Sequence, residues 1–383
     1  MSDSARETVL LLQSQQSLGQ EALAAFHSAV DAAEMDLRVL RTGLSPLLRE
    51  HRDIPPAIVE TVLSEDQWPT LMVGASNVGA IVTNDEYLQG TARSLCLTRG
   101  IRSRIPASYL RYRDKGLMRQ ALAAAGIPVP VSLLIRDQQV TPFGNDPELA
   151  IGETIVVKPT DEANLRGIKV KVFDSACTNS SGGDYLIERF LEGPQYHSEV
   201  FVENGIVSHL YSGRYVRPLL DLTRGRVAGS VRTDPLTESR LGRLAERACG
   251  ILGTDGTFTA HVEFLSADDG PDSLRVGEVC ARAPGGEIPF QATAIGGYDL
   301  EEVNLAAQAG LTGPRPNFQN AASAGWLWQV GRPLRQVTLQ APPDELEVRY
   351  SDIVLGGRVR VSGGDVTEVD DAVEQIIRAN TEQ

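Results

Sequence analysis

The sequence has little positive charge for its size. Its 383 residues include 36 lysines and arginines against 50 aspartates and glutamates, which gives a formal net charge of −14. A protein that binds nucleic acid or an anionic membrane over a broad surface needs an excess of positive charge, because phosphate groups dominate both partners. The composition therefore excludes such a surface, and we expect the basic residues to act locally.

Cysteine and histidine are also scarce. The four cysteines, Cys96, Cys177, Cys249 and Cys280, are too widely spaced for a zinc-binding pattern or a disulfide framework. The five histidines form no His-Glu-x-x-His pattern, which argues against a zinc hydrolase. No apolar run approaches the length of a membrane span, and MSDSARET lacks the cationic start of a secretion signal. These absences predict a reduced, cytoplasmic protein without a membrane partner.

What the chain does contain is enough apolar material, 42% of its residues, for two or three domains with separate cores. Strand and helix patterns alternate before residue 110 and predict a small α/β domain, with one helix over 85–97. Asp114 is placed to cap a helix that Gly126 ends. From about residue 321 a β-rich part follows, and a helix over 366–379 closes it.

The most informative stretch is FTAHVEFL, which is followed after an acidic segment by RVGEVCARAPGGEIP. Read at a period of two, the first run places its apolar residues on one face and His261 and Glu263 on the other. The second run places Glu278, Cys280 and Arg282 on a common face. A turn between the runs predicts a hairpin in which Glu263 and Glu278 lie side by side.

Two adjacent carboxylates repel each other unless a positive charge lies between them. Mg²⁺ suits such a pair, because it binds one or two carboxylates together with waters and substrate phosphate oxygens. Arg282 could hold a phosphate or a developing oxyanion through two parallel hydrogen bonds. The alternative is a surface hairpin with solvated charges, although the paired glycines that follow favour the close approach of a ligand.

Three other charged residues lie in surroundings that favour a nucleotide. Lys115 begins the predicted helix, where the helix dipole disfavours a cation. Lys158 ends a very apolar strand, where an ammonium group is costly without an anionic partner. Glu188 interrupts an apolar segment at a bend whose backbone could bind an adenine. Each has a plain alternative too: an exposed lysine, or a charge at the edge of a strand.

Taken in order, these segments resemble the ATP-grasp superfamily, most closely its carboxylate-amine ligases of the amino-acid and dipeptide ligase type. The resemblance covers residues 112–300 and rests on DKGLMRQALAAAGIPVP, VVKPTDEANLRGIKV, LIERFLEGPQYHSEV, HVEF and GEVCARAPGG. It implies a fold that mixes helices and strands (α/β in the broad sense), namely the ATP-grasp fold, which is classed as α+β. The implied parts are an N-terminal α/β domain over 1–111, a small lid domain over 112–190, and a larger domain over 191–383 with a β-rich extension from about 320.

The resemblance also implies roles for individual residues. Glu263 and Glu278 match magnesium ligands, and Arg282 matches the arginine that stabilises the phosphate and the intermediate. Substrate contacts are expected from Gly285 and Gly286. The residues implied to contact ATP, from the phosphates through the adenine to the ribose, are Lys115, Lys158, Arg166, Glu188, Arg189, Phe190, Leu191 and Gln195.

Two further substrate contacts are expected, and two departures from the family pattern stand out. Glu287 is expected to hold an ammonium group, and His209 or His261 to assist deprotonation of an amine unless these histidines are structural. The stretch that matches the phosphate-covering loop, ANLRG, has less glycine than is usual. Cys280 stands where many relatives have asparagine, and a thiol is a poor ligand for Mg²⁺.

The implied reaction joins a carboxylate to an amine through an acyl phosphate, with release of ADP and phosphate. ATP and Mg²⁺ are the implied cofactors, with two ions favoured and Mn²⁺ as an alternative. The implied partners are a small carboxylate and a small amine such as an amino acid. A homodimer is left open. Alternatives are another acceptor (a carboxylase, a thioester-forming ligase or a carrier-protein aminoacylating ligase) and a nucleotide-binding protein without turnover.

Overall fold

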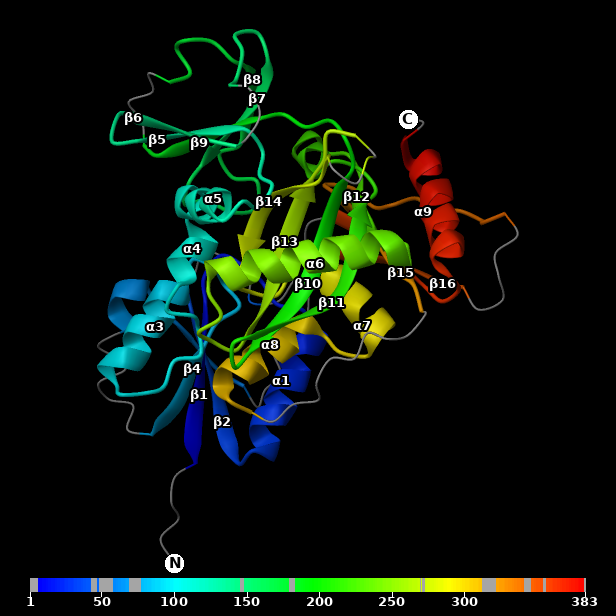
Figure 1. Cartoon of the computed structure of the whole chain (residues 1–383). Coiled ribbons are helices and arrows are strands. Elements are labelled where there is room, and N and C mark those ends of the chain that lie inside the picture. Colours follow the sequence, from blue (N-terminus) through cyan, green and yellow to red (C-terminus); the bar gives the residue numbers. More distant parts are fainter. Residues whose placement is uncertain are drawn as a thin grey trace, which may run out of the picture.

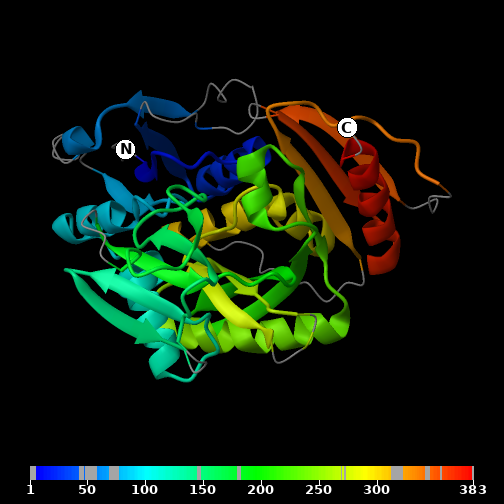
Figure 2. The same ribbon diagram turned by 90° about the horizontal axis from the view of Figure 1, so that it is seen from above.

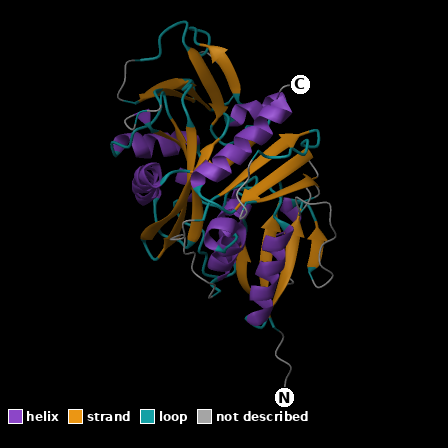
Figure 3. Ribbon diagram, turned by 90° about the vertical axis from the view of Figure 1, so that its right-hand side faces the viewer, coloured by secondary structure: helices purple, strands orange, loops and turns teal. Residues whose placement is uncertain are grey.

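Three β-sheets form the frame of the chain, and helices pack between and around them (Figure 1). The computed structural model describes residues 6–42, 47, 58–68, 77–144, 148–178, 183–268, 270, 273–311, 322–340, 346–353 and 356–381. The five-stranded sheet lies at the top of Figure 3 and the four-stranded sheet lies at the bottom, near the N-terminus. Within the described ranges, no helix combines the length and the apolar character needed to cross a membrane.

The first sheet is parallel and has the strand order β3-β2-β1-β4. Its central strand is apolar and buried, as is typical of a parallel strand covered on both faces. The predicted helix over 85–97 begins only at Gln89, because Asp85 turns back and accepts hydrogen bonds from the backbone of Ser14, Gln15 and Gln16. The elements are β1 (Glu7–Gln13), α1 (Gln20–Ala32), β2 (Met35–Arg41), β3 (Val59–Val62), η1 (Glu65–Gln67), β4 (Val78–Val82) and α3 (Gln89–Thr98).

The second sheet has five antiparallel strands in the order β6-β5-β9-β7-β8. A helix that starts at Lys115 leads into it, and the predicted cap is confirmed: the Asp114 carboxylate accepts a hydrogen bond of 2.8 Å from Leu117 N. The elements are α4 (Tyr109–Arg113), α5 (Lys115–Ala124), β5 (Ser132–Arg136), β6 (Gln139–Phe143), β7 (Thr154–Pro159), β8 (Lys169–Val172) and β9 (Tyr185–Arg189).

The third sheet has eight antiparallel strands in the order β14-β13-β10-β11-β12-β15-β17-β16. The β-rich C-terminal part belongs to this sheet, because β15 pairs with β12. The elements are β10 (Gln195–Glu203), β11 (Ile206–Tyr215), η2 (Leu219–Arg224), β12 (Ala228–Arg232), β13 (Phe258–Leu265), β14 (Arg275–Cys280), β15 (Ala324–Val330), β16 (Glu347–Ile353) and β17 (Gly356–Ser362).

Helices cover the eight-stranded sheet on both faces. Helix α6 (Pro235–Leu252) packs on one face against the apolar side of β13, so the predicted division of FTAHVEFL into two faces is confirmed. On the other face lie α7 (Ile288–Gly296) and α8 (Leu300–Ala309), and α8 also packs against α1 and β4 of the first sheet. Helix α9 (Val366–Thr381) packs beside β15 and β17 (Figure 2).

The predicted hairpin is present as β13 and β14. In its register Glu263 lies opposite Glu278 and His261 lies opposite Cys280, and a bulge follows Glu263. The pairing expected from the two-residue period is therefore confirmed. Part of the expected turn between the strands, including Asp269, lies outside the described residues.

Candidate active site

A cavity of about 590 Å³ is lined by residues that belong to, or follow, strands of all three sheets. It gathers segments that are far apart in the sequence, from the loop after β1 to strand β15. Of the residues expected to act at the site, those that line it are Lys115, Lys158, Arg166, Glu188, Arg189, Phe190, Leu191, Gln195, His261, Glu263, Glu278, Arg282, Gly285 and Gly286.

Glu263 and Glu278 stand next to each other on the cavity wall with side chains that are 30% and 20% exposed. Lys115 at the start of α5 approaches Glu278, with 3.0 Å between Nζ and Oε1, and its Nζ also donates to the Glu162 carbonyl. Burial favours a neutral Lys115, but the charge of Glu278 outweighs burial and raises the lysine pKa above its usual value. A cation thus already lies beside one of the two carboxylates.

Arg282 follows β14 and is buried against Glu86. Its Nε and Nη2 donate to Glu86 Oε1 at 2.9 and 2.7 Å, and its Nη1 donates to the Ala283 carbonyl. Burial opposes both charges, yet the attraction between them raises the pKa of Arg282 and lowers that of Glu86. Glu86 therefore fixes the guanidinium at the cavity wall.

Glu188 on β9 lies between two cations. Lys158 Nζ is 2.5 Å from Glu188 Oε2, and the guanidinium of Arg119 on α5 pairs with Oε1. Arg119 also donates to the Val276 and Gly277 carbonyls of β14. Burial raises the pKa of Glu188, but the charges of Lys158 and Arg119 lower it below its usual value. Glu188 lines the cavity while its oxygens are held by these two partners.

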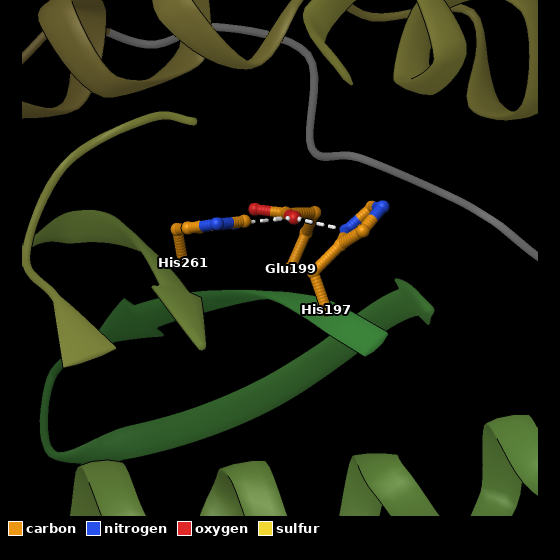
Figure 4. Close-up of side chains that lie close together, drawn as sticks. All are labelled: His197, Glu199 and His261. Atoms are coloured by element: carbon orange, nitrogen blue, oxygen red, sulfur yellow. Dashed lines mark hydrogen bonds and ion pairs between the residues drawn. The ribbon is translucent and has the colours of Figure 1, made fainter. Parts of the chain in front are cut away.

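A second buried carboxylate, Glu199 on β10, lies between two imidazoles (Figure 4). Its Oε1 is 2.8 Å from His197 Nδ1 and 2.8 Å from His261 Nδ1. Burial opposes the Glu199 charge, but the charge of His261 and the two hydrogen bonds lower the Glu199 pKa to about 2. Burial likewise opposes a charged His261, yet Glu199 raises the His261 pKa to about 10. Burial prevails at His197, whose pKa is lowered.

The remaining expected nucleotide contacts come from the five-stranded sheet and the segments that follow its strands. Arg189 pairs with Glu153 at 3.3 Å, and Gln195 Oε1 accepts a hydrogen bond from Leu219 N. In the glycine-poor loop, Asn164 and Leu165 have left-handed φ values of 54° and 61°. These residues adopt the conformation that glycine usually supplies, at some cost in strain.

Two expected substrate contacts do not belong to the described lining. His209 packs on the opposite face of the sheet against α6, where its Nε2 is 2.9 Å from Ser212 Oγ. A bulge in β10–β11 places Val200 opposite His209 and thereby turns this imidazole away. Glu287 is buried and turned toward Arg358 and Arg360, with ion pairs of 3.3 and 2.7 Å. Its charge is satisfied by two arginines of β17, so it is not presented to an ammonium group.

Solved structures resemble this fold along nearly the whole chain, although no protein-family model matches the sequence and no curated protein does. One is an L-amino acid ligase from Bacillus licheniformis, 15% identical, with a TM-score of 0.68 and 98% of both chains covered. An N5-carboxyaminoimidazole ribonucleotide synthetase from Thermotoga maritima is 15% identical, with a TM-score of 0.64 and the same coverage. A carboxyaminoimidazole ribonucleotide synthase from Aspergillus clavatus, complexed with ATP, is 14% identical; its TM-score is 0.69, with 98% of this chain and 99% of that chain covered.

The chain has the ATP-grasp fold. The fold class expected from the order of five short segments is thus confirmed. At identities of 14–15% the likeness is evidence for the fold. Within the ATP-grasp fold, what this chain binds and does has to be argued from its own cavity.

The cavity residues suit a hard divalent ion. Glu263 and Glu278 offer paired carboxylate oxygens at a partly exposed wall, which is the donor set that Mg²⁺ prefers. Cys280 lies deeper, 5% exposed, with Sγ 3.9 Å from Glu278 Oε1. Burial raises the pKa of its thiol well above the usual value, and a neutral thiol is no ligand for Mg²⁺. The carboxylate pair therefore fits the ion and the cysteine does not.

Several residues that line the cavity, or that hold a lining residue from behind, were not expected from the sequence. Arg119 could have been found, since it lies four residues after Lys115 and so on the same side of a predicted helix. Trp326 and Trp328 alternate along β15, a spacing that places both on one face of a strand. Glu86 and Tyr215 carry no local signal, because their partners lie 196 and 48 residues away in the chain.

Proposed function

We propose that this chain is an ATP-dependent carboxylate-amine ligase. One observation carries the proposal: the paired Glu263 and Glu278 share a cavity with Lys115, Lys158 and Arg282. Two carboxylates with three cations match what phosphoryl transfer to a carboxylate demands, namely metal ligands beside groups that neutralise phosphate charge.

The reaction divides into two steps. A carboxylate oxygen of the substrate attacks the γ-phosphorus of ATP, the bond to the β-phosphate oxygen breaks, and an acyl phosphate and ADP result. An amine nitrogen then attacks the acyl carbon, inorganic phosphate leaves, and the nitrogen loses a proton. Mg²⁺, when held by Glu263 and Glu278, would neutralise charge on the phosphates. Lys115 and Lys158 would bind phosphate oxygens, and Arg282, fixed by Glu86, would stabilise the tetrahedral oxyanion.

The direct test is a phosphate-release screen with ATP and Mg²⁺. Amino acids and small carboxylates are offered singly and in pairs, with bicarbonate included because similar structures include carboxyaminoimidazole ribonucleotide synthetases and a biotin carboxylase. A signal that needs both a carboxylate and an amine supports the proposal. Nucleotide binding without phosphate release under any pair would leave a protein without turnover, and full ligation by Glu278→Ala would refute the metal assignment.

Three broader expectations belong to this proposal. The division into domains near residues 111 and 190 is tested by limited proteolysis. A cytoplasmic location is tested by fractionation of cells, and a homodimer by light scattering of the purified chain.

A further inference from the structure

Glu263, the proposed metal ligand on β13, has neighbours on its buried side as well as on the cavity side. Its Oε1 lies 3.4 Å from His261 Nε2 and 3.5 Å from the Tyr215 hydroxyl. Tyr215 is itself 3.4 Å from His261 Nε2. His261 and Tyr215 thus meet Glu263 at one oxygen, and the orientation of its carboxylate depends on where the His261 ring stands.

The His261 ring is held from behind by Glu199. The distance between His261 Nδ1 and Glu199 Oε1 is 2.8 Å, which is typical of a charge-assisted hydrogen bond, and Glu199 is 1% exposed. Strand pairing enforces the contact, because Glu199 lies directly opposite His261 in the β10–β13 register. Both ring nitrogens of His261 therefore have partners: Glu199 on one side, and Glu263 with Tyr215 on the other.

Glu199 is in turn fixed by a third strand. His197 Nδ1 donates to the same Oε1 at 2.8 Å, and His197 Nε2 is 2.7 Å from Ser230 Oγ on β12. The chain of contacts runs from Ser230 through His197, Glu199 and His261 to Glu263 (Figure 4 shows its central three residues). Every link before Glu263 is buried, so water does not compete for these hydrogen bonds.

We propose that Glu199 is a positioning residue which, through His261, holds the Glu263 carboxylate in place to bind the metal that accompanies ATP. This inference rests on the proposed function, since it takes Glu263 as a metal ligand. Groups behind a ligand fix its orientation, and their loss typically weakens metal binding about 10–100-fold.

His197, Glu199 and His261 are also residue types that could bind a second metal ion, but their geometry favours the positioning role. The Glu199 carboxylate lies between the two rings, and each Nδ1 is at hydrogen-bond distance from one shared oxygen. The second oxygen of Glu199 is buried without a hydrogen-bond partner. The residues satisfy one another through one oxygen, which locks the rings without an ion.

The test measures metal binding without turnover. Mn²⁺ is titrated into the full chain with saturating ADP, and free Mn²⁺ is followed by its electron paramagnetic resonance signal. Glu199→Gln keeps the shape of the side chain but removes its charge, and we expect its Mn²⁺ affinity to fall about 10–100-fold. ADP affinity without metal should stay within twofold of wild type, because Glu199 does not line the cavity.

His261→Gln should weaken Mn²⁺ binding by a similar factor, and it replaces Glu199→Gln as the test if that variant does not fold. The double variant should be no weaker than the weaker single variant, because both changes cut one chain of contacts. His209→Gln is the matched control: a half-buried histidine of the same sheet that packs against α6. Its Mn²⁺ affinity should equal that of wild type.

The outcomes separate the two proposals. Wild-type protein that binds no Mn²⁺ with nucleotide would refute the proposed function. Wild-type protein that binds Mn²⁺, beside Glu199→Gln or His261→Gln with unchanged affinity, would overturn the positioning role alone. Equal loss in His209→Gln would also overturn it, since the effect would then be a general response of the sheet.

Discussion

Glu188 and Glu199 are both fully buried carboxylates held by two partners, but the partners differ in kind. Glu188, on the five-stranded sheet, lies between the ammonium group of Lys158 and the guanidinium group of Arg119. Glu199, on the eight-stranded sheet, lies between two imidazoles: His261, whose pKa Glu199 raises to about 10, and His197, whose pKa is lowered by burial. The first arrangement ties elements together permanently, since Arg119 also bonds β14. The second arrangement orients the His261 ring, which contacts Glu199 on one side and Glu263 on the other.

The largest effect should come from breaking the ion pair between Arg119 and Glu188. Arg119→Met leaves Glu188 buried with Lys158 as its remaining ion-pair partner, and it should destabilise the protein by about 3–5 kcal/mol in chemical denaturation. Combining it with Glu188→Gln should restore part of the loss, because the fully buried carboxylate is then neutral and only the partly exposed Lys158 lacks its ion-pair partner. A single-variant loss below about 1 kcal/mol would contradict a structural role for Arg119.

The second-largest effect should appear in the stability of the protein at low pH. A carboxyl whose pKa is depressed contributes stability that is present above the usual pKa and lost as pH falls through the folded value. For Glu199 this window runs from 4.5 down to about 2 and corresponds to about 3 kcal/mol. Stability measured against pH should therefore fall less steeply in Glu199→Gln than in wild type. Parallel curves for the two proteins would show that folding does not lower the pKa of Glu199.

Lys158 pairs with Glu188 and also lines the cavity, where we propose that it binds a phosphate of ATP. Lys158→Met should weaken ATP binding roughly 10–100-fold in calorimetry, the value of one hydrogen bond between charged groups. Lys171→Met, at an exposed position of β8 in the same sheet, is the matched control and should bind ATP as wild type does. Equal affinities in both variants would remove Lys158 from the proposed phosphate contacts.

The smallest effect should come from Ser230, the residue of this series of contacts that lies farthest from Glu263. Ser230→Ala removes the partner of His197 Nε2 and should cost about 1 kcal/mol in denaturation experiments. Mn²⁺ affinity should change by less than twofold, because Glu199 still holds His261. A loss as large as that of Arg119→Met would mean that the two clusters do not differ in kind.

The sequence was sufficient to predict those features that depend on residues close together in the chain. Alternation in FTAHVEFL and RVGEVC placed Glu263 opposite Glu278, and the cap at Asp114 marked the start of α5. Both depend on periods of a few residues, which tertiary contacts left unchanged. Lys158 at the end of an apolar strand was likewise recognisable from its immediate surroundings, and it does line the cavity.

What could not be predicted depends on distant segments or on irregular backbone. Arg282 meets Glu86 across 196 residues, and Glu287 is paired by arginines that follow it by more than 70. A bulge moved His209 to the face that α6 covers, and a single extra residue of this kind leaves no mark in the alternation. Such contacts are consequences of the assembled sheet.

Gly213 on β11 lies against the Glu199 cluster. A Cβ atom at this position would stand 2.2 Å from His197 Nε2 and 2.6 Å from Ser230 Oγ. Any larger residue must push the imidazole and the hydroxyl apart, although the backbone here is ordinary strand. A library with all twenty amino acids at residue 213, selected for activity, should therefore return glycine almost alone. A sheet position that needs no special backbone angle would thus be among the least tolerant of change in the protein.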